Sequence, residues 1–380
     1  MRLLFMQPLL APPGGGAGVA AWMLQALREE HEITLLTWWP VDLDDVNRFW
    51  GTSLRASDFR AVRVPAPWRW LVDYAPMPLD MLRSAIMMRI ARRLRPLYDL
   101  PMTADNEADF GMVGVQYVHY PWNTLPQPPD DVRWYHRKLA VAVYYRMFAA
   151  VSGFTVNGTH RNLTLVNSNW TGRLAGSRYG FVTRTVYPPV TGDFPDVPWE
   201  ARQPGFVCLG RISPEKELDR LIEIVAGVRR HVPAATLHIV GTPAGRAYFR
   251  RIAARARDHG FAVHQNVSRT ALADLVSHQK YGIHGMPAEH FGMAPAEMVR
   301  AGCIVWVPDG GGQVEIVDDP RLTYSSVDDA IGKIVATLRD PHEEASLRKH
   351  LAGRAAVFSV ERFMREVREA VHDAARAGAR

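Results

Sequence analysis

Short apolar runs alternate with amphipathic helical stretches along most of this chain of 380 residues. The apolar runs are about four to eight residues long, the length of strands that are buried on both faces. This alternation predicts an α/β protein with doubly wound parallel sheets. The predicted strands of the first half are Leu3–Gln7, Ile33–Thr37, Ala61–Val64, Val113–Tyr120, Leu163–Asn167 and Arg184–Tyr187. Those of the second half are Phe206–Gly210, Thr236–Val240, Ala262–Gln265, Tyr281–His284 and Cys303–Val307.

A stretch with five prolines and no helix or strand pattern, Tyr187–Pro204, interrupts the alternation. We therefore predict a first domain over 1–190, a linker over 191–204 and a second domain over 205–357. Residues 358–380 have a helical pattern and could pack back on the first domain. Two Rossmann-like domains that face each other across a cleft would bind ligands outside the carboxyl ends of their strands.

Composition narrows the classes of protein that fit. Hydrophobic residues make up 47% of the chain and charged residues 22%, which is ordinary for a globular protein and excludes a disordered chain. The net charge of +6 suits anionic ligands but is too small to indicate nucleic acid. The two cysteines, Cys208 and Cys303, lie in apolar runs. We interpret them as core residues, which excludes a disulfide scaffold or a cysteine-based zinc site.

The chain lacks the sequence signals of membrane spanning and secretion. No apolar run approaches the length of a membrane-spanning helix, which is about 18 residues or more. The N-terminal run MRLLFMQPLL has no small-residue cleavage site, so we interpret it as a strand rather than a signal peptide. These features predict a cytoplasmic protein.

The first chemical motif is the glycine-rich stretch Pro12–Gly18, between a predicted strand and a predicted helix. Glycines let backbone amides approach a ligand, and a helix N-terminus favours anions. The stretch is either a tight turn or a loop that contacts a donor phosphate or an acceptor. It does not fit an NAD site, because the second strand ends without an acidic residue and the first acid is Asp42.

The second motif, Gly210–Lys216, follows the first strand of the second domain and has the sequence GRISPEK. Ser213 fits a helix N-cap and Pro214 fits the first helical position. Arg211 and Lys216 would then lie beside a helix N-terminus, where two cations suit a diphosphate. The plain alternative is two solvated side chains at a helix start.

The third motif contains two glutamates, Glu289 and Glu297, on either side of a glycine and a proline. We expect Glu289 in a loop and Glu297 inside a helix that begins near Gly292. Free amides after Phe291 can hold phosphate oxygens, and Glu297 can accept both hydroxyls of a ribose. Glu289 would lie deeper, beside a sugar ring. The alternative is one exposed acid and one ordinary helical glutamate.

Two further strand ends carry candidate residues. Asp309–Val317 is a third glycine-rich loop between a strand and a helix. His119 ends a strand of the first domain, where it faces the expected cleft or is satisfied in the core. We find no convincing metal cluster, since Asp42 and Asp44 form an Asp-x-Asp pair in a loop of the wrong domain.

These motifs together resemble the retaining GT-B glycosyltransferases of family GT4. The similarity to the donor half of that family lies in GRISPEK, EHFGMAPAE and VPDGGGQVEIV. The ALG11-like mannosyltransferase branch is similar in VHYP, KLAVAVYYRMFA, LTLVNSNWT and TVYPPV. In order, the similar segments span about residues 116–317.

The resemblance implies a sugar-nucleotide-dependent transferase that retains anomeric configuration by front-face substitution and needs no obligatory metal or other cofactor. It implies donor-binding roles for Gly16, Arg211, Lys216, His290, Phe291, Gly292, Met293 and Glu297. It implies catalytic roles for His119, Arg211, Lys216 and Glu289. The cations would grip the donor diphosphate, Glu297 the ribose, and Glu289 and His119 would lie near the transferred sugar. The ALG11-like segments favour GDP-mannose over a UDP-sugar.

The acceptor implied by the resemblance is a hydroxyl of a sugar, a glycoside or a lipid-linked molecule. The segment Leu79–Leu97 combines an apolar stripe with five arginines, so it could lie on an anionic membrane surface. Trp68 and Trp70 lie nearby in the sequence. The alternative is a helix that packs on the first sheet with its arginines solvated.

Two other functions fit the same architecture. One is an enzyme of the UDP-N-acetylglucosamine 2-epimerase type, which would need its own acid and base carboxylates in the cleft. The other is a non-catalytic protein that binds sugar nucleotides. The ALG11-like segments disfavour the first, and the full set of candidate contact residues disfavours the second.

Overall fold

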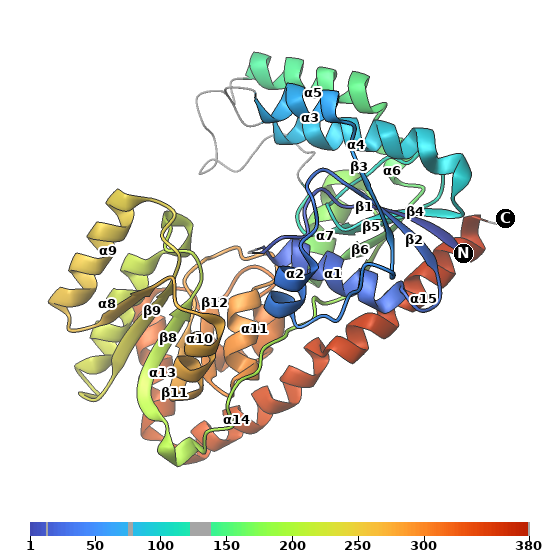
Figure 1. The fold of residues 1–380 in the computed structure, drawn as a ribbon. Helices are drawn as coiled ribbons and strands as arrows, with labels where there is room; N and C mark the ends of the chain where they lie inside the picture. The colour runs from blue at the N-terminus through green and yellow to red at the C-terminus, as the bar shows by residue number, and fades with distance from the viewer. Residues whose placement is uncertain (13, 75–78, 122–137, 379–380) are drawn as a thin grey trace. The chain divides into compact units, whose positions relative to one another are not determined.

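The computed structural model describes residues 1–12, 14–74, 79–121 and 138–378, which form two compact units (Figure 1). Unit 1 consists of Met1–Tyr187 together with Val360–Arg380, and unit 2 of Pro188–Ser359. The boundary at Pro188 precedes the predicted linker, so that residues 191–204 lie within unit 2. None of the described helices is long and apolar enough to cross a membrane.

Unit 1 is built on a parallel sheet in which the described strands follow the order β3-β2-β1-β4-β5-β6-β7. The order reverses between β1 and β4, as in a Rossmann-type sheet. The strands are β1 (Arg2–Met6), β2 (Glu32–Thr37), β3 (Arg60–Arg63), β4 (Leu100–Thr103), β5 (Val115–Val118), β6 (Leu163–Val166) and β7 (Thr183–Thr185). This arrangement confirms the predicted α/β class.

Helices cover both faces of this sheet, because successive side chains of each strand point to opposite sides. Leu3 and Phe5 of β1 join a cluster with α1, α2 and α15, whereas Leu4 and Met6 join one with α3, α4 and α5. The helices of the unit are α1 (Gly15–Leu27), α2 (Leu43–Trp50), α3 (Ala66–Asp73), α4 (Asp80–Leu94), α5 (Lys138–Ser152), α6 (Val156–Thr159), α7 (Asn169–Tyr179) and α15 (Val360–Gly378).

The terminal helix α15 completes the core of unit 1, although it follows unit 2 in the chain (Figure 1). Its buried side chains recur at helical spacing and pack in one cluster with α1 and β1. They are Phe363, Val367, Ala370, Val371 and Ala374. Arg184 of β7 and Asp373 of α15 form an ion pair of 3.0 Å that ties the helix to the sheet edge.

The apolar side of the segment Leu79–Leu97, which forms α4 and a short 3-10 turn, packs inside unit 1. Ile86 is only 4% exposed, and Leu82, Ile90 and Leu94 pack against the same cluster. Leu97, at the end of the stripe, is 58% exposed. Most of the apolar stripe that suggested membrane contact is therefore used against the sheet and its neighbouring helices.

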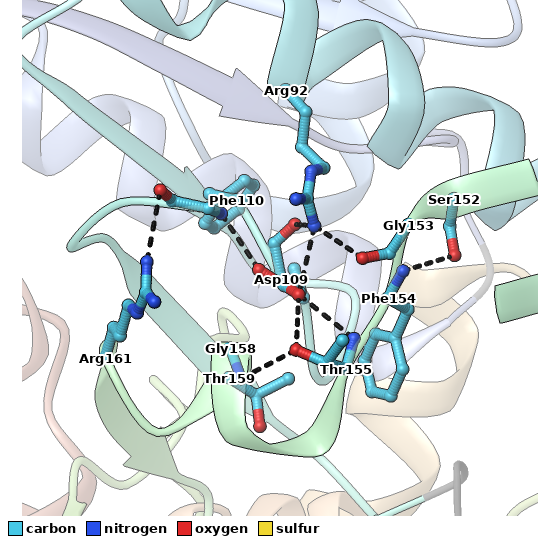
Figure 2. A network of polar contacts seen from close by, with 12 residues as sticks. Arg92, Asp109, Phe110, Ser152, Gly153, Phe154, Thr155, Gly158, Thr159 and Arg161 are labelled. Carbon is cyan, nitrogen blue, oxygen red and sulfur yellow. Dashed lines mark hydrogen bonds and ion pairs between the residues drawn. The ribbon is translucent and has the colours of Figure 1, made fainter. Parts of the chain in front are cut away.

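The expectation that the arginines of this segment are solvated is wrong for most of them. Arg83 lies over the ring of Trp39 at 4.3 Å, and Arg89 and Arg95 donate hydrogen bonds to backbone carbonyls. Arg92 joins a buried polar network (Figure 2). These partners lie on loops and, for Arg89, on α5, and only the tertiary fold brings them beside α4. Of the five arginines, Arg93 is the one with no described partner.

Asp109 is the centre of that network, and its side chain is 3% exposed (Figure 2). Its Oδ2 accepts hydrogen bonds from the backbone nitrogen and the hydroxyl of Thr155, both at 3.0 Å. Arg92 Nη1 lies 3.0 Å from the same oxygen and donates to the carbonyl of Gly153 at 2.6 Å. The network therefore fixes α4 against the turn that precedes α6.

Unit 2 contains a second parallel sheet, whose described strands follow the order β10-β9-β8-β11-β12-β13. The strands are β8 (Gln203–Leu209), β9 (Thr236–Gly241), β10 (Ala262–Gln265), β11 (Gln279–Ile283), β12 (Ile304–Pro308) and β13 (Thr323–Tyr324). The helices are α8 (Leu218–Arg229), α9 (Arg246–Asp258), α10 (Arg269–Ser277), α11 (Met293–Arg300), α12 (Val314–Val317), α13 (Val327–Arg339) and α14 (Pro341–Ala355). The order reverses between β8 and β11, and ligands bind at such switch points.

The sequence pattern missed two strands, one in each unit. β4 carries Pro101, which removes a backbone donor and breaks the strand pattern, yet its four residues are all buried between β1 and β5. β13 has only two residues. Cys208 and Cys303 are both buried, as expected, and burial raises the pKa of each thiol to about 12.

Candidate donor-binding site

Three neighbouring strands of unit 2, β8, β11 and β12, end at the switch point of its sheet. Their carboxyl ends lead into the three candidate motifs of the second half, Gly210–Lys216, Glu289–Glu297 and Asp309–Val317. Because parallel strands end at one edge of the sheet, these three segments lie at the same edge. The structure therefore places the candidate motifs of the second half where an open α/β sheet binds its ligand.

Lys216 and Glu289 form a charge pair at this edge. The Lys216 ammonium nitrogen donates to Glu289 Oε2 at 2.5 Å, and both side chains are less than one-fifth exposed, at 16% and 18%. His284, which is 1% exposed, lies with Nε2 3.2 Å from the same carboxylate oxygen. The cluster thus brings together one residue after β8 and two after β11.

The ionisation of the cluster follows from these contacts. Burial alone would raise the pKa of Glu289, but the His284 hydrogen bond and the Lys216 charge hold it well below its usual value. Burial lowers the pKa of His284, and the Lys216 charge lowers it further against the opposing effect of Glu289. Glu289 is therefore a carboxylate and His284 a neutral imidazole at pH 7.

His284 is a site residue that the sequence analysis did not select. A carboxylate only accepts hydrogen bonds, so the proton of the neutral imidazole lies on Nε2, toward Glu289. Nδ1 is then a buried nitrogen without a hydrogen-bond partner among the described residues. The one signal in the sequence was a histidine at the end of an apolar strand, five residues before the glutamate.

Replacing His284 by glutamine should flatten the pH dependence of stability. An unfolded chain takes up a proton on this residue near pH 6.5, whereas the lowered pKa keeps the folded imidazole neutral. The free energy of unfolding should therefore fall as the pH drops below 6.5. Below pH 6.5 the free energy of unfolding of the wild type should fall more steeply than that of the His284→Gln variant, by up to about 1.4 kcal/mol per pH unit.

Urea unfolding between pH 7.5 and 5 would measure this difference. His238 also has a pKa lowered by burial, and it is present in both proteins, so the comparison isolates His284. Equal slopes in the two proteins would contradict the assignment of a neutral His284.

The glycine-rich segment after β12 holds the Glu289 segment in place through backbone contacts. Gly312 donates to the carbonyl of Glu289 at 2.7 Å, and the Gln313 amide donates to the carbonyl of Met286 at 2.7 Å. Gly311 has a φ of 78°, and a Cβ there would lie 2.7 Å from the backbone nitrogen of Glu289. Gly311 is therefore needed for the close packing of this loop on the Glu289 segment.

The turn after β8 differs from the prediction. Ser213 makes no side-chain cap bond, and Pro214 opens a 3-10 turn that ends at Lys216. Glu217 then adopts a left-handed conformation with φ 46°, and α8 begins only at Leu218. Lys216 therefore lies in a tight turn before the helix, close enough to the sheet edge to reach Glu289.

Arg211 does not join the Lys216 cluster. Its side chain is 71% exposed and pairs with Glu215, four residues later, at 3.0 Å. A surface pair of this kind contributes little to stability. Arg211 can therefore leave Glu215 for an anionic ligand at small cost.

The helix α11 begins at Met293, as the glutamate motif predicted. Gly292 precedes it with φ 108°, and the amides of Met293 and Ala294 have no acceptor within the helix. These first-turn N–H groups and the positive end of the helix dipole favour an anion. Phe291 is 3% exposed and packs on Phe358, so it supports the turn.

Glu297, one turn into α11, pairs with Arg269 rather than with the Lys216 cluster. Arg269 Nη1 donates to Glu297 Oε1 at 2.9 Å. Burial raises the pKa of Glu297 in spite of this charge. Arg269 opens α10 behind the N-cap Ser268, so its position after β10 was the only sequence signal for it. His290 lies between the two glutamates, and burial lowers its pKa.

The two candidates of unit 1, Gly16 and His119, lie next to each other. A Cβ at Gly16 would lie 3.2 Å from His119 Nε2, and that nitrogen is 3.0 Å from the carbonyl of Ala104. Gly18, in contrast, faces the Trp50 ring, where a Cβ would lie 2.7 Å from the nearest ring carbon. Of the two glycines, Gly18 is thus required for the packing of α1 on α2.

Comparison with known proteins gives matches in sequence and in structure. The family described as glycosyl transferases group 1 matches residues 192–355. The Mus musculus protein named GDP-Man:Man(3)GlcNAc(2)-PP-Dol alpha-1,2-mannosyltransferase is 30% identical over 192 residues, which are 46% of this chain and 39% of the mouse protein. The Homo sapiens protein of the same name is 28% identical over 189 residues, 45% of this chain and 38% of that protein. The matched part thus spans about two-fifths of these curated relatives.

Solved structures match nearly the whole chain. The structure of Anabaena Alr3699/HepE in complex with UDP has a TM-score of 0.69 and 15% identity, and covers 98% of this chain and 100% of that chain. The structure of WaaG, a glycosyltransferase of lipopolysaccharide biosynthesis, has a TM-score of 0.66 and 16% identity, with 97% and 99% covered. These likenesses show the fold, which is the GT-B fold that the motif resemblance implied. The match to the family described as glycosyl transferases group 1 thus lies within unit 2, over residues 192–355.

Proposed function

We propose that the chain is a retaining, metal-independent mannosyltransferase that uses GDP-mannose. The observation that carries the proposal is the buried Lys216–Glu289 pair at the switch point of a group 1 glycosyl transferase domain. The choice of GDP-mannose rests on the curated relatives, which are named as alpha-1,2-mannosyltransferases that use GDP-mannose.

Lys216 has the chemistry to bind the donor diphosphate without releasing Glu289. An ammonium group has three N–H donors, and the contacts to Glu289 and Met286 use two of them. The third can donate to a phosphate oxygen. Arg211 and the amides of Met293 and Ala294 would add donors on the same sheet edge. Together they would stabilise the charge of the leaving nucleoside diphosphate in place of a metal ion.

Glu289 and Glu297 would hold the two sugars of the donor. Arg269 occupies Oε1 of Glu297, so Oε2 is the oxygen that we assign to a ribose hydroxyl. Glu289, already ionised and fixed by Lys216 and His284, would accept hydroxyls of the transferred mannose. A fixed carboxylate of this kind orients a sugar at no further cost of ordering.

The residues of unit 1 would serve the acceptor side of the reaction. We assign His119 to contact with the transferred sugar and Gly16 to a backbone contact near the diphosphate. The names of the curated relatives include a dolichol diphosphate glycan, so we propose a hydroxyl of a lipid-linked glycan as the acceptor.

Thermal unfolding with nucleotides is the direct test of the donor. A ligand that binds only the native state raises the melting temperature, and saturation at about 100 times the Kd corresponds to about 2.7 kcal/mol. For a unit of this size we expect the melting temperature to rise by about 5–10 °C with GDP or GDP-mannose, without added metal and with EDTA present. UDP and UDP-glucose should give smaller shifts.

A larger shift with UDP would overturn the choice of base, and a shift that requires Mg²⁺ would overturn metal independence. Incubation with GDP-mannose and a lipid-linked glycan, followed by NMR of the anomeric proton, would test transfer and retention. A product of inverted configuration would contradict the proposal.

A further inference from the structure

A cluster of aromatic and aliphatic side chains on α3 of unit 1 faces solvent. Trp68 is 47% exposed, Trp70 70%, Leu71 61% and Tyr74, the C-cap residue, 77%. At 100° per residue these four side chains cover one arc of about 160° on the helix. The rings of Trp70 and Tyr74 lie together, with 5.2 Å between their centroids. We call this set the α3 patch.

The helix that carries the patch is held firmly from its other side. Val72 is 3% exposed in the cluster that also contains side chains of α4 and α5. Arg69 Nε donates to the carbonyl of Val64 at 2.9 Å, and Asp73 accepts from the Trp38 indole at 2.9 Å. The contacts on its other side therefore hold α3 in an orientation that leaves its large apolar side chains exposed to solvent.

The charges of this part of unit 1 are predominantly positive. α3, α4 and α5 together contain seven Lys and Arg residues and two Asp residues, Asp73 and Asp80. Both aspartates pair with Arg83. Arg63 before α3, Arg93 on α4 and Arg146 on α5 are exposed and have no described carboxylate partner. The patch is thus accompanied by three cations that have no carboxylate partner within the described part of the chain.

We propose that the α3 patch inserts into the interfacial region of an anionic lipid bilayer. Trp and Tyr favour the level of the lipid headgroups, where their rings are apolar and their polar atoms stay hydrated. Arg63, Arg93 and Arg146, which have no carboxylate partner among the described residues, would attract anionic headgroups. The aromatic patch and these cations together match the chemistry of an anionic membrane surface. With eight residues, α3 is too short to cross a bilayer and would lie in its plane.

This proposal places the membrane contact on α3, whereas the sequence analysis placed it on the segment Leu79–Leu97, which forms α4. The apolar side of α4 packs within unit 1, and four of the five arginines of the segment Leu79–Leu97 bind protein groups. α3 buries little of its own apolar surface. The inference concerns unit 1 alone and does not depend on the donor proposed for unit 2.

Co-sedimentation of the full chain with vesicles would test the inference. Vesicles of phosphatidylcholine with about one-third phosphatidylglycerol should bind the wild type in low salt, and pure phosphatidylcholine vesicles should bind it more weakly. The double variant Trp70→Ser/Leu71→Ser should lose binding to the anionic vesicles by about tenfold or more. The matched control is Val182→Ser, which removes an apolar side chain that is 92% exposed elsewhere in unit 1, and it should bind like the wild type.

A second double variant separates the contribution of the arginines from that of the apolar α3 patch. Arg93→Ser/Arg146→Ser should weaken binding to anionic vesicles only, while leaving the weak binding to phosphatidylcholine unchanged. All substituted residues are exposed, so melting temperatures should match the wild type. Absence of vesicle binding by the wild type, or equal binding by the Trp70→Ser/Leu71→Ser variant, would overturn the inference. So would a wild-type dimer in light scattering that this variant converts to a monomer, because the patch would then be a protein contact.

Discussion

Lys216→Ala is expected to lower kcat of the proposed transfer by about 100-fold or more while the protein stays folded. The ammonium group is buried at the switch point of unit 2, where it would face the charge that develops on the leaving diphosphate. In a water-poor site one such fixed donor contributes about 3–4 kcal/mol to the barrier. Steady-state rates with GDP-mannose, together with a thermal melt of each protein, would measure the effect.

Two further variants separate catalysis from stability. Lys216→Ala leaves the Glu289 carboxylate without its cation, which lowers stability as well as rate. The double variant Lys216→Ala/Glu289→Gln removes that unpaired charge, so the melting temperature should recover while the rate stays low. Lys333→Ala breaks a different ion pair of unit 2, the one between Lys333 and Asp329, and should keep its full rate. A folded Lys216→Ala protein that transfers at the wild-type rate would refute the role.

Gly311→Ala is expected to destabilise unit 2 by about 3 kcal/mol. The left-handed conformation of this residue, with φ 78°, costs about 1–2 kcal/mol for a residue with a side chain. The new Cβ would also meet the backbone nitrogen of Glu289 at 2.7 Å, and such overpacking costs about 1–3 kcal/mol. Urea unfolding would measure the loss, and nucleotide binding should weaken because the Glu289 segment has to move.

The control for this variant is Gly332→Ala, in the middle of α13, where a Cβ would meet nothing within 4 Å. It should be neutral or slightly stabilising, because alanine favours a helix more than glycine does. A Gly311→Ala protein as stable as Gly332→Ala would show that the contact of the glycine loop with Glu289 is dispensable.

The parallel sheets were predictable because most of their strands, such as β1, β8 and β12, are short apolar runs that can be recognised without knowing their neighbours. The motifs at the strand ends were predictable for a related reason: Gly292 and the proline after it mark the start of α11 in the sequence alone. The position of Lys216 within reach of Glu289 followed from both motifs lying at one sheet edge.

Side-chain pairs between residues far apart in the chain could not be predicted from the sequence. Arg269 opens a helix after β10, and nothing local indicates that it pairs with Glu297. His284 looks like the end of a strand until the fold places it beside a charged pair. The arginines of α4 failed as a membrane signal for the same reason, since Asp109 and the carbonyl of Gly153 bind Arg92 only in the folded chain.

The position of α15 has a consequence for the order in which the chain folds during synthesis. The ribosome completes every residue of unit 2 before it makes Phe363 and Val367, which the core of unit 1 requires. Nascent chains therefore carry an unfinished first unit, with the sites on α1 and β1 that receive α15 still open to water. Unit 1, most of which is synthesised first, is therefore the last unit to become stable. A stop codon shortly after Ser359 would remove α15 and so destabilise unit 1, at the N-terminal end of the chain.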